Sequence, residues 1–212
     1  MSIKLCCKLN VIFKSIYWVC QRLKRSLYIY FKILSLGDTF IGKTSIVLRF
    51  SDDKFVGNKF TTVDIDFKTN YIKVGEDSVK FFLWDIAGQE KYKNATKFYY
   101  KDANGVLLIY DICCRECFER TEFRLKELKE INKIDEFYII LVVKKIYLEN
   151  NRVKSKEEAE KYVSDNNINY SEVSAKTRTG IINLFKKIIL FEIYIKIKNK
   201  IANIPNNNKN SL

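Results

Sequence analysis

The sequence predicts an α/β fold in which a doubly wound, mostly parallel sheet of six strands is flanked by helices. Short apolar runs at residues 104–110 and 137–143 have the length and composition of strands that are buried on both faces. A charged helical pattern at residues 116–131 lies between them, and strands that alternate with helices of this length are typical of doubly wound sheets. The 212 residues, 47% of them apolar, suffice for one such domain with a buried core.

The first predicted elements are a strand at residues 31–36, a loop, and a helix that begins at residues 45–50. The loop has the spacing G-x-x-x-x-G-K-[ST] of a phosphate-binding P-loop, as in P-loop NTPases. Its backbone N–H groups and the positive end of the following helix attract phosphate. We expect Lys43 to reach the β- and γ-phosphates and Thr44 to offer its hydroxyl to Mg²⁺. The loop reads Gly37-Asp38-Thr39-Phe40-Ile41-Gly42-Lys43-Thr44.

The remaining elements continue the alternation after a polar loop that contains Thr61 and Thr62. Two strands joined at Gly75 form a β-hairpin, because apolar and polar side chains alternate in the first of them. A later helix is capped by Ser155, with Glu158 three residues on. We expect the strands at residues 65–74 and 79–84, the capped helix at 155–166, a last strand at 168–173 and a long helix at 179–198.

The net charge of +13 lies mainly at the two ends of the chain. Residues 1–32 carry +7 and residues 186–212 carry +5, which leaves +1 for everything between them. The middle is therefore nearly neutral, and we expect no nucleic acid as a partner. We divide the chain into a basic, apolar N-terminal extension (1–30), the domain (31–195) and a basic, Asn-rich tail (196–212).

The six cysteines and the absence of histidine restrict disulfide and metal chemistry. The cysteines lack the even spacing of a disulfide framework, so a reducing compartment fits best. Cys113, Cys114 and Cys117 lie close together, but no second pair of ligands accompanies them, which disfavours a zinc site. No apolar run approaches the ~18 to 20 residues of a membrane span. A soluble or peripheral protein is expected.

A second group of functional residues follows the second hairpin strand. Asp85 stands at the carboxyl end of that strand, which is the edge where doubly wound sheets bind ligands, and we expect it to hold Mg²⁺. Gly88 lets a backbone N–H approach a γ-phosphate without a Cβ in the way. Gln89 is then the candidate catalytic residue, placed to orient an attacking water.

Across residues 31–190 the motifs resemble those of the Ras superfamily of small GTPases, and within it most of all the Rab branch. The general motifs occur in the order of that superfamily, and four further stretches resemble those that characterise Rab proteins. The general motifs are residues 37–44, Thr61-Thr62, Trp84–Glu90 and Ser174-Ala175-Lys176; the Rab-like stretches are Ile65-Asp66-Phe67, Lys91-Tyr92, Phe98-Tyr99-Tyr100 and Tyr110-Asp111-Ile112.

The resemblance implies a GTP/GDP switch in vesicle trafficking, with Mg²⁺ held by Thr44, Thr62 and Asp85. Residues 54–66 and 88–100 would be switch segments, ordered by the γ-phosphate, through which exchange proteins, activating proteins and effectors bind. Nucleotide contacts are implied at Gly37, Asp38, Thr39, Phe40, Ile41, Gly42, Lys43, Thr44, Ser45, Thr62, Gly88, Lys145, Ser174, Ala175 and Lys176.

The stretch that reads guanine departs from the family pattern. Asn-Lys-x-Asp should follow the strand that ends at Val143, but the chain reads Lys144-Lys145-Ile146-Tyr147 and keeps only the Lys. The missing Asp normally accepts two hydrogen bonds from guanine, each contributing roughly 1.5–3 kcal/mol because one partner is charged. We therefore expect a weakened preference for guanine. Phe40 is also bulky for a loop that favours small residues.

The C-terminal part of the sequence departs as well. Rab proteins resemble one another in ending with one or two prenylated cysteines, whereas the last cysteine here is Cys117, so no prenylation site is expected. The basic ends would give only weak, salt-sensitive contact with an anionic membrane. We expect a cytoplasmic protein that is at most peripheral on endomembranes. Anchoring through the N-terminal extension, or ends that differ in the working product, stay open.

Three functions remain to be weighed. The first is a Rab-like GTPase with slow, Mg²⁺-dependent hydrolysis. The second is a pseudo-GTPase, a binding module with degraded guanine selectivity, to which Lys144 and Tyr147 point. The third is a nucleotide kinase, against which the stretch Trp84–Glu90 and the absence of an Arg-rich lid argue.

Overall fold

The computed structural model describes residues 29–57, 62, 65–74, 77–88, 99–100, 102–131 and 138–202. Most of the N-terminal extension and the last ten residues of the tail lie outside this range, and so does most of the sequence for which membrane contact is predicted.

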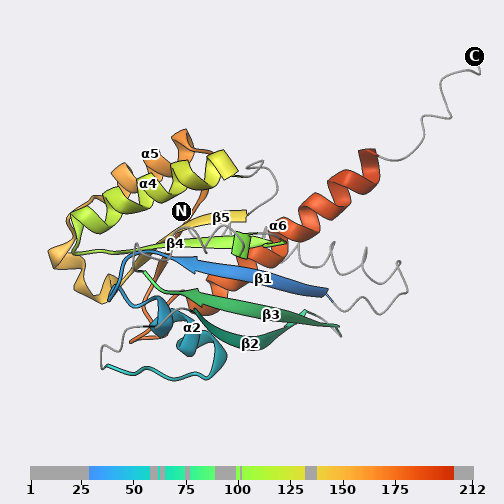
Figure 1. Ribbon diagram of the computed structural model, residues 1–212, viewed down its shortest axis with the longest axis horizontal. Helices are drawn as coiled ribbons and strands as arrows, with labels where there is room; N and C mark the ends of the chain where they lie inside the picture. Colours follow the sequence, from blue (N-terminus) through green and yellow to red (C-terminus); the bar gives the residue numbers. More distant parts are fainter. Residues whose placement is uncertain are drawn as a thin grey trace, which may run out of the picture.

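Six strands form one sheet within the described part of the chain, in the order β2-β3-β1-β4-β5-β6 (Figure 1). β2 and β3 pair antiparallel, and each of the other neighbouring pairs is parallel. The predicted doubly wound, mostly parallel sheet with a hairpin is therefore confirmed. The strands are β1 (Ile29–Leu36), β2 (Ile65–Val74), β3 (Asp77–Ile86), β4 (Gly105–Asp111), β5 (Tyr138–Lys144) and β6 (Asn169–Val173).

Helices cover both faces of this sheet (Figure 1). α4 and α5 lie on one face, while α2 and α6 lie on the other, where they also contact each other. The helices are α2 (Lys43–Ser51), α4 (Arg115–Ile131), the 3₁₀ helix η3 (Ile146–Asn151), α5 (Lys156–Asp165) and α6 (Ile181–Ala202).

The alternation of side chains along the strands builds two cores, one on each face of the sheet. In β1, Phe31 and Ile33 point into the core with α2 and α6, whereas Leu34 and Leu36 point into the core with α4 and α5. Every residue of β4 and of β5 is buried, because both faces are covered. This double coverage is the physical reason why those two strands appear in the sequence as continuous apolar runs.

The observed elements differ from the predicted ones in a few places. β1 begins at Ile29, two residues earlier than expected, because Ile29 and Tyr30 continue its parallel pairing with β3. η3 was not predicted, since its six residues carry no helical period and Leu148 has non-helical φ and ψ. The capping box of α5 is present as expected, with Ser155 and Glu158 bonding each other's backbone. Among the described helices, none is both long and apolar enough to cross a membrane.

Three phenylalanines join elements that lie far apart in the sequence. Phe50 of α2 stacks on Phe185 of α6 with ring centroids 3.6 Å apart. Phe81 of β3 meets both rings edge-on, at 5.5 Å from Phe50 and 5.6 Å from Phe185. α2 follows the phosphate-binding loop directly, so this cluster fixes the helix whose first turn faces the ligand site.

We predict that Phe185→Ala lowers the free energy of unfolding by about 3–5 kcal/mol, because it leaves a cavity between α2, α6 and the sheet. Ile182→Ala on the same helix is the matched control, since Ile182 is 49% exposed. Its cost should stay below about 1 kcal/mol. Urea unfolding followed by circular dichroism measures both variants, and equal losses in the two would contradict a core centred on Phe185.

Candidate nucleotide-binding site

The loop between β1 and α2 is folded around the side chain of Lys43. The Lys43 Nζ donates to the carbonyl oxygens of Gly37 at 3.1 Å and of Asp38 at 2.9 Å. Gly42, the N-cap residue of α2, has φ 92°, a left-handed conformation that favours glycine. The loop thus wraps a buried ammonium group at the start of a helix, an arrangement that attracts phosphate.

Three hydroxyl groups converge on the carboxylate of Asp85 from different segments. Ser35 of β1 donates to Asp85 Oδ1 at 3.0 Å. Thr62 donates to Asp85 Oδ2 at 3.3 Å, and Thr44 of α2 donates to the same oxygen. The Thr44 and Thr62 hydroxyls are themselves 3.0 Å apart. The structure therefore brings together all three residues expected to hold a metal ion.

This donor set fits Mg²⁺. Mg²⁺ binds hard oxygen ligands in an octahedron at about 2.0–2.1 Å, so neighbouring ligand oxygens lie about 3 Å apart. The spacing of 3.0 Å between Thr44 Oγ1 and Thr62 Oγ1 matches that requirement. A hydroxyl pair backed by a carboxylate is also the chemistry that a magnesium ion on a nucleotide needs.

Burial makes the charged forms of Asp85 and Lys43 unfavourable unless opposite charges lie beside them. Asp85 is fully buried, and desolvation raises its pKa, while the hydrogen bonds from Thr44, Ser35 and Thr62 and the charge of Lys43 act in the opposite direction. Desolvation lowers the pKa of Lys43 to about 8. A cation beside Asp85 and an anion beside Lys43 would each favour the charged form of its neighbour.

A cavity of about 490 Å³ opens next to these groups, a size suited to a small-molecule ligand. It runs from the phosphate loop to the ends of β5 and β6. Of the residues expected to contact nucleotide, those that line it are Thr39, Phe40, Gly42, Lys43, Thr44, Ser45, Thr62, Gly88, Lys145, Ala175 and Lys176.

The other predicted site residues have different positions. Gly37 and Asp38 face Lys43 through their carbonyl oxygens, and Ile41 is buried in the core with α2 and α6. Ser174 is fully buried and its hydroxyl accepts from the backbone N–H of Thr177, so it shapes the turn that presents Ala175. Gln89 lies outside the described residues, and so do residues 58–61 and 63–64 of the first switch segment and residues 89–98 of the second.

The far end of the cavity is lined by cations. Lys144, Lys145 and Lys176 line it together with Tyr147, and no carboxylate side chain lines it within the described residues. Lys176 Nζ lies 4.9 Å from the centroid of the Tyr147 ring. The hydrogen-bond acceptor that reads guanine in the family pattern is thus replaced by an aromatic ring under an ammonium group.

Lys144 is the most unusual of these cations because it is only 5% exposed. Its Nζ lies 3.5 Å from Asp111 Oδ2, and a Cβ added to Gly42 would lie 3.0 Å from the same nitrogen. Desolvation lowers the pKa of Lys144 to about 7, although Asp111 acts against the shift. A titratable positive charge therefore lies directly against the phosphate loop.

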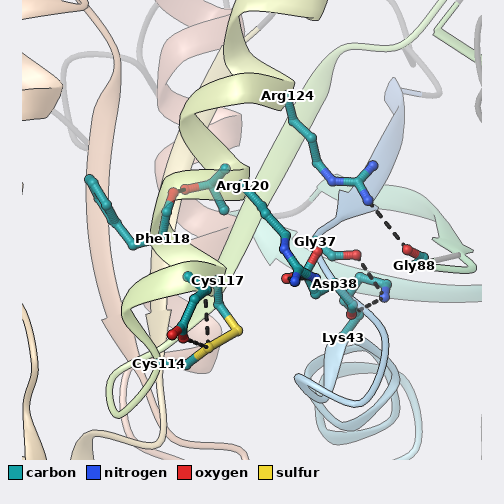
Figure 2. Close-up of polar contacts among 11 residues, drawn as sticks. Gly37, Asp38, Lys43, Gly88, Cys114, Cys117, Phe118, Arg120 and Arg124 are labelled. Atoms are coloured by element: carbon teal, nitrogen blue, oxygen red, sulfur yellow. Dashed lines mark hydrogen bonds and ion pairs between the residues drawn. A yellow bond between two sulfur atoms is a disulfide. The ribbon is translucent and has the colours of Figure 1, made fainter. Parts of the chain in front are cut away.

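Two arginines of α4 also reach this region, and sequence reasoning missed them. Arg120 pairs with Asp38 Oδ2 at 3.1 Å, and Arg124 donates to the carbonyl oxygen of Gly88 at 3.3 Å (Figure 2). A Cβ on Gly88 would lie 2.3 Å from the Thr39 nitrogen, so the end of β3 packs directly on the phosphate loop. The i,i+4 spacing of the two arginines indicates that they share one face of the helix. Which residues they contact, however, depends on how α4 packs against the sheet.

Comparison with known proteins identifies the family of this chain. The Ras family model matches residues 32–193. Ras-related protein Rab-1 of Theileria parva is 33% identical over 178 residues, covering 84% of this chain and 78% of that protein. Ras-related protein Rab-13 of Canis lupus familiaris is 35% identical over 158 residues, covering 74% of this chain and 77% of the relative. Ras-related protein Rab-18-B of Danio rerio is 35% identical with the same coverage of 74% and 77%. With the family model matching residues 32–193 and relatives that are at least 33% identical over most of the chain, the chain belongs to the Ras family of small GTPases.

Proposed function

We propose that this protein is a Rab-like GTP/GDP switch in vesicle trafficking, with slow, Mg²⁺-dependent GTP hydrolysis. The observation that carries the proposal is the convergence of Thr44 and Thr62 on Asp85 beside the buried Lys43. The names of the related Rab proteins support the trafficking role. Exchange proteins, activating proteins and effectors would bind through residues 54–66 and 88–100, and the basic ends would give weak contact with anionic membranes.

In this proposal each described residue has a defined task. Lys43 neutralises charge on the β- and γ-phosphates, and Thr44, Thr62 and Asp85 hold Mg²⁺. A magnesium ion held by these residues would supply positive charge against the negative charge that develops on the phosphate during transfer. Gln89 would orient the attacking water. Without a helper protein we expect turnover on the order of 10⁻⁴ to 10⁻² s⁻¹.

The base end of the cavity supports a second candidate, a pseudo-GTPase with degraded guanine selectivity. Tyr147 stands where the family pattern has the guanine-binding Asp, and Lys144 stands where it has a neutral Asn. A site that leaves the guanine N–H donors without an acceptor loses discrimination by up to several orders of magnitude. The two candidates share the phosphate end and differ in which nucleotide they retain.

The first prediction concerns the metal. Asp85→Asn keeps the size of the side chain but removes its charge, so the Mg²⁺ concentration needed for GTP binding should rise about 10- to 100-fold. Asp66→Asn is the matched control, because Asp66 faces Asp85 in the β2–β3 register and its side chain is exposed. Calorimetric titration of GTP at stepped Mg²⁺ concentrations measures both. An unchanged Mg²⁺ requirement in Asp85→Asn would rule out this metal site. A complete lack of guanine nucleotide binding by the unmodified protein would refute the proposed switch function.

The second prediction separates the two candidate functions. The double variant Lys144→Asn/Tyr147→Asp restores the guanine acceptor and should raise the preference for GTP over ATP at least about tenfold, the effect of one charged hydrogen bond. Lys144→Asn/Tyr147→Asn has the same shape without the carboxylate and should show no such gain. Competition between GTP and ATP for the protein measures the preference. If both double variants match the unmodified chain, guanine is read elsewhere and the degraded-selectivity candidate fails.

The third prediction follows from the buried lysines. In the free protein Lys144 and Lys43 have pKa values lowered to about 7 and about 8, so above neutral pH they are increasingly uncharged. Phosphate favours their protonated forms, so binding must take up protons and nucleotide affinity should fall as pH rises from 7 to 9. The slope of the fall in affinity is at most about one decade per pH unit for each proton taken up.

The variant Lys144→Asn should remove the part of the fall in affinity that begins near pH 7. Calorimetry in buffers of different ionisation enthalpy measures the proton uptake, and an affinity that stays constant over this range contradicts the prediction.

A further inference from the structure

Cys114 and Cys117 form a disulfide at the start of α4 (Figure 2). The sequence predicted reduced thiols here, since the cysteine spacing fits no disulfide framework. The neighbouring Cys113 is free, and its backbone N–H donates to Asp111 Oδ1 at 3.2 Å. The chain therefore places an oxidised Cys-x-x-Cys pair and an unpaired cysteine side by side. Of the three, Cys117 lies in the first turn of α4 and Cys114 immediately precedes the helix.

The disulfide borders a second cavity of about 510 Å³ that adjoins the phosphate loop. Its lining comes from α4 and the residue before it (Cys114, Glu116, Cys117 and Arg120), from the phosphate loop (Asp38 and Thr39) and from Gly88 just after β3. Thr39 and Gly88 line both cavities. The disulfide pair thus lines a space that reaches Thr39 and Gly88, which also line the nucleotide cavity.

We propose that Cys114 and Cys117 are a thiol–disulfide redox site whose co-substrate is a thiol of the glutathione class, and that its redox state sets how firmly α4 holds the phosphate loop. The link to nucleotide binding rests on the function proposed above; the redox chemistry and the effect on the loop do not.

The reduction balances with two thiol molecules. The thiolate of the first attacks Cys117 Sγ, the S–S bond breaks, and its electron pair leaves on Cys114 Sγ. The thiolate of the second attacks the external sulfur of the mixed disulfide, so Cys117 leaves as a thiolate and the oxidised, disulfide form of the thiol is released. Two electrons pass to the protein, and its two sulfurs take up protons according to pH.

The position of Cys114 explains why it is the leaving group. It immediately precedes α4, and its Sγ accepts the backbone N–H of Cys117 at 3.2 Å, as the side chain of an N-cap residue does. N–H groups and the positive end of a helix stabilise a thiolate at this position. The Glu116 Oε2, 3.8 Å from the same sulfur, opposes that charge in part.

Cys113 serves as the internal control. Burial and the neighbouring Asp111 raise the pKa of its thiol, so it stays protonated and reacts slowly. Cys113 lines neither of the two cavities. A thiol reagent should therefore distinguish Cys113 from the pair, although the three cysteines lie within five residues of one another.

The route from the disulfide to the phosphate loop is short. Arg120 lies three residues beyond Cys117 and pairs with Asp38 at 3.1 Å, and the carbonyl oxygen of Asp38 accepts from Lys43 at 2.9 Å (Figure 2). Arg124, one turn further, holds the carbonyl oxygen of Gly88. A closed disulfide fixes the first turn of α4, and the two arginines extend from the turns that follow it. Its reduction frees that turn, so the reduced form should hold residues 37–44 less firmly.

The test begins with the full chain equilibrated in glutathione buffers of stepped redox potential. Alkylation followed by peptide mass analysis should show Cys114 and Cys117 changing together as one two-electron couple, while Cys113 stays reduced throughout. Hydrogen exchange at residues 37–44 and 115–124 should be about fivefold or more faster in the reduced form, the lower end of ordinary coupling between sites. Neither measurement needs a nucleotide.

Variants and nucleotide release complete the experiment. Cys114→Ser/Cys117→Ser keeps an N-cap oxygen but cannot oxidise, so its exchange should match the reduced form in every buffer. Cys113→Ser should behave as the unmodified chain. Release of fluorescent GDP should be about fivefold or more faster from the reduced form. Equal exchange of residues 37–44 in the two redox forms, or a pair that does not change between buffers, overturns the proposal. Absence of GDP binding in both forms refutes the nucleotide function instead, and hydrogen exchange then decides the redox site.

Discussion

The buried carboxylate of Asp85 is the group on which the phosphate end of the site depends. A carboxylate with no exposed surface is costly unless donors surround it, and the donors here come from β1, from the first turn of α2 and from Thr62. Leaving one of them without its partner would cost about 1–3 kcal/mol. A strand, a helix and a segment between α2 and β2 are therefore held together by the group that would also support the metal ion.

The other end of the cavity, lined by Lys144, Lys145 and Tyr147, departs from the family sequence pattern without a change of fold. The ion pairs made by Lys144 and Lys145 explain why. Lys144 is the last residue of β5, and an unpaired ammonium at that depth would be strongly destabilising. Asp111 ends the neighbouring strand β4, directly opposite Lys144 in the register, and forms ion pairs with both Lys144 and Lys145. Burial alone would raise the pKa of Asp111, but the hydrogen bond from Lys145 and the charge of Lys144 bring it below its usual value. One carboxylate thus pairs with two cations. For this reason, a Lys at position 144, where the family pattern has Asn, is compatible with the pairing of β4 and β5.

The sequence allowed the elements to be predicted wherever one physical rule governs a stretch. β4 and β5 follow from double burial, α5 from its capping box, and the phosphate loop from its spacing. η3 could not be predicted, because a short 3₁₀ segment with a kink at Leu148 has no period to detect. The contacts of Arg120 and Arg124 depend on the docking of α4 against the sheet, which local patterns do not specify. The same holds for the cavity beside Cys114 and Cys117.

Asp38 links the phosphate loop to α4. Its carbonyl oxygen accepts from Lys43 inside the loop, while its carboxylate pairs with Arg120 outside it. The Arg120 side chain is 63% exposed, and exposed ion pairs contribute only about 0–1 kcal/mol. Desolvation raises the pKa of Asp38, and the charge of Arg120 partly offsets this rise. The ion pair therefore favours the charged form of Asp38, although it contributes little to stability. The carboxylate of Asp85, in contrast, is fully buried, so leaving one of its hydrogen bonds unmade costs more than opening an exposed ion pair. A small displacement at the start of α4 can therefore open the Asp38–Arg120 contact and loosen the phosphate loop without dismantling the group that would hold the metal.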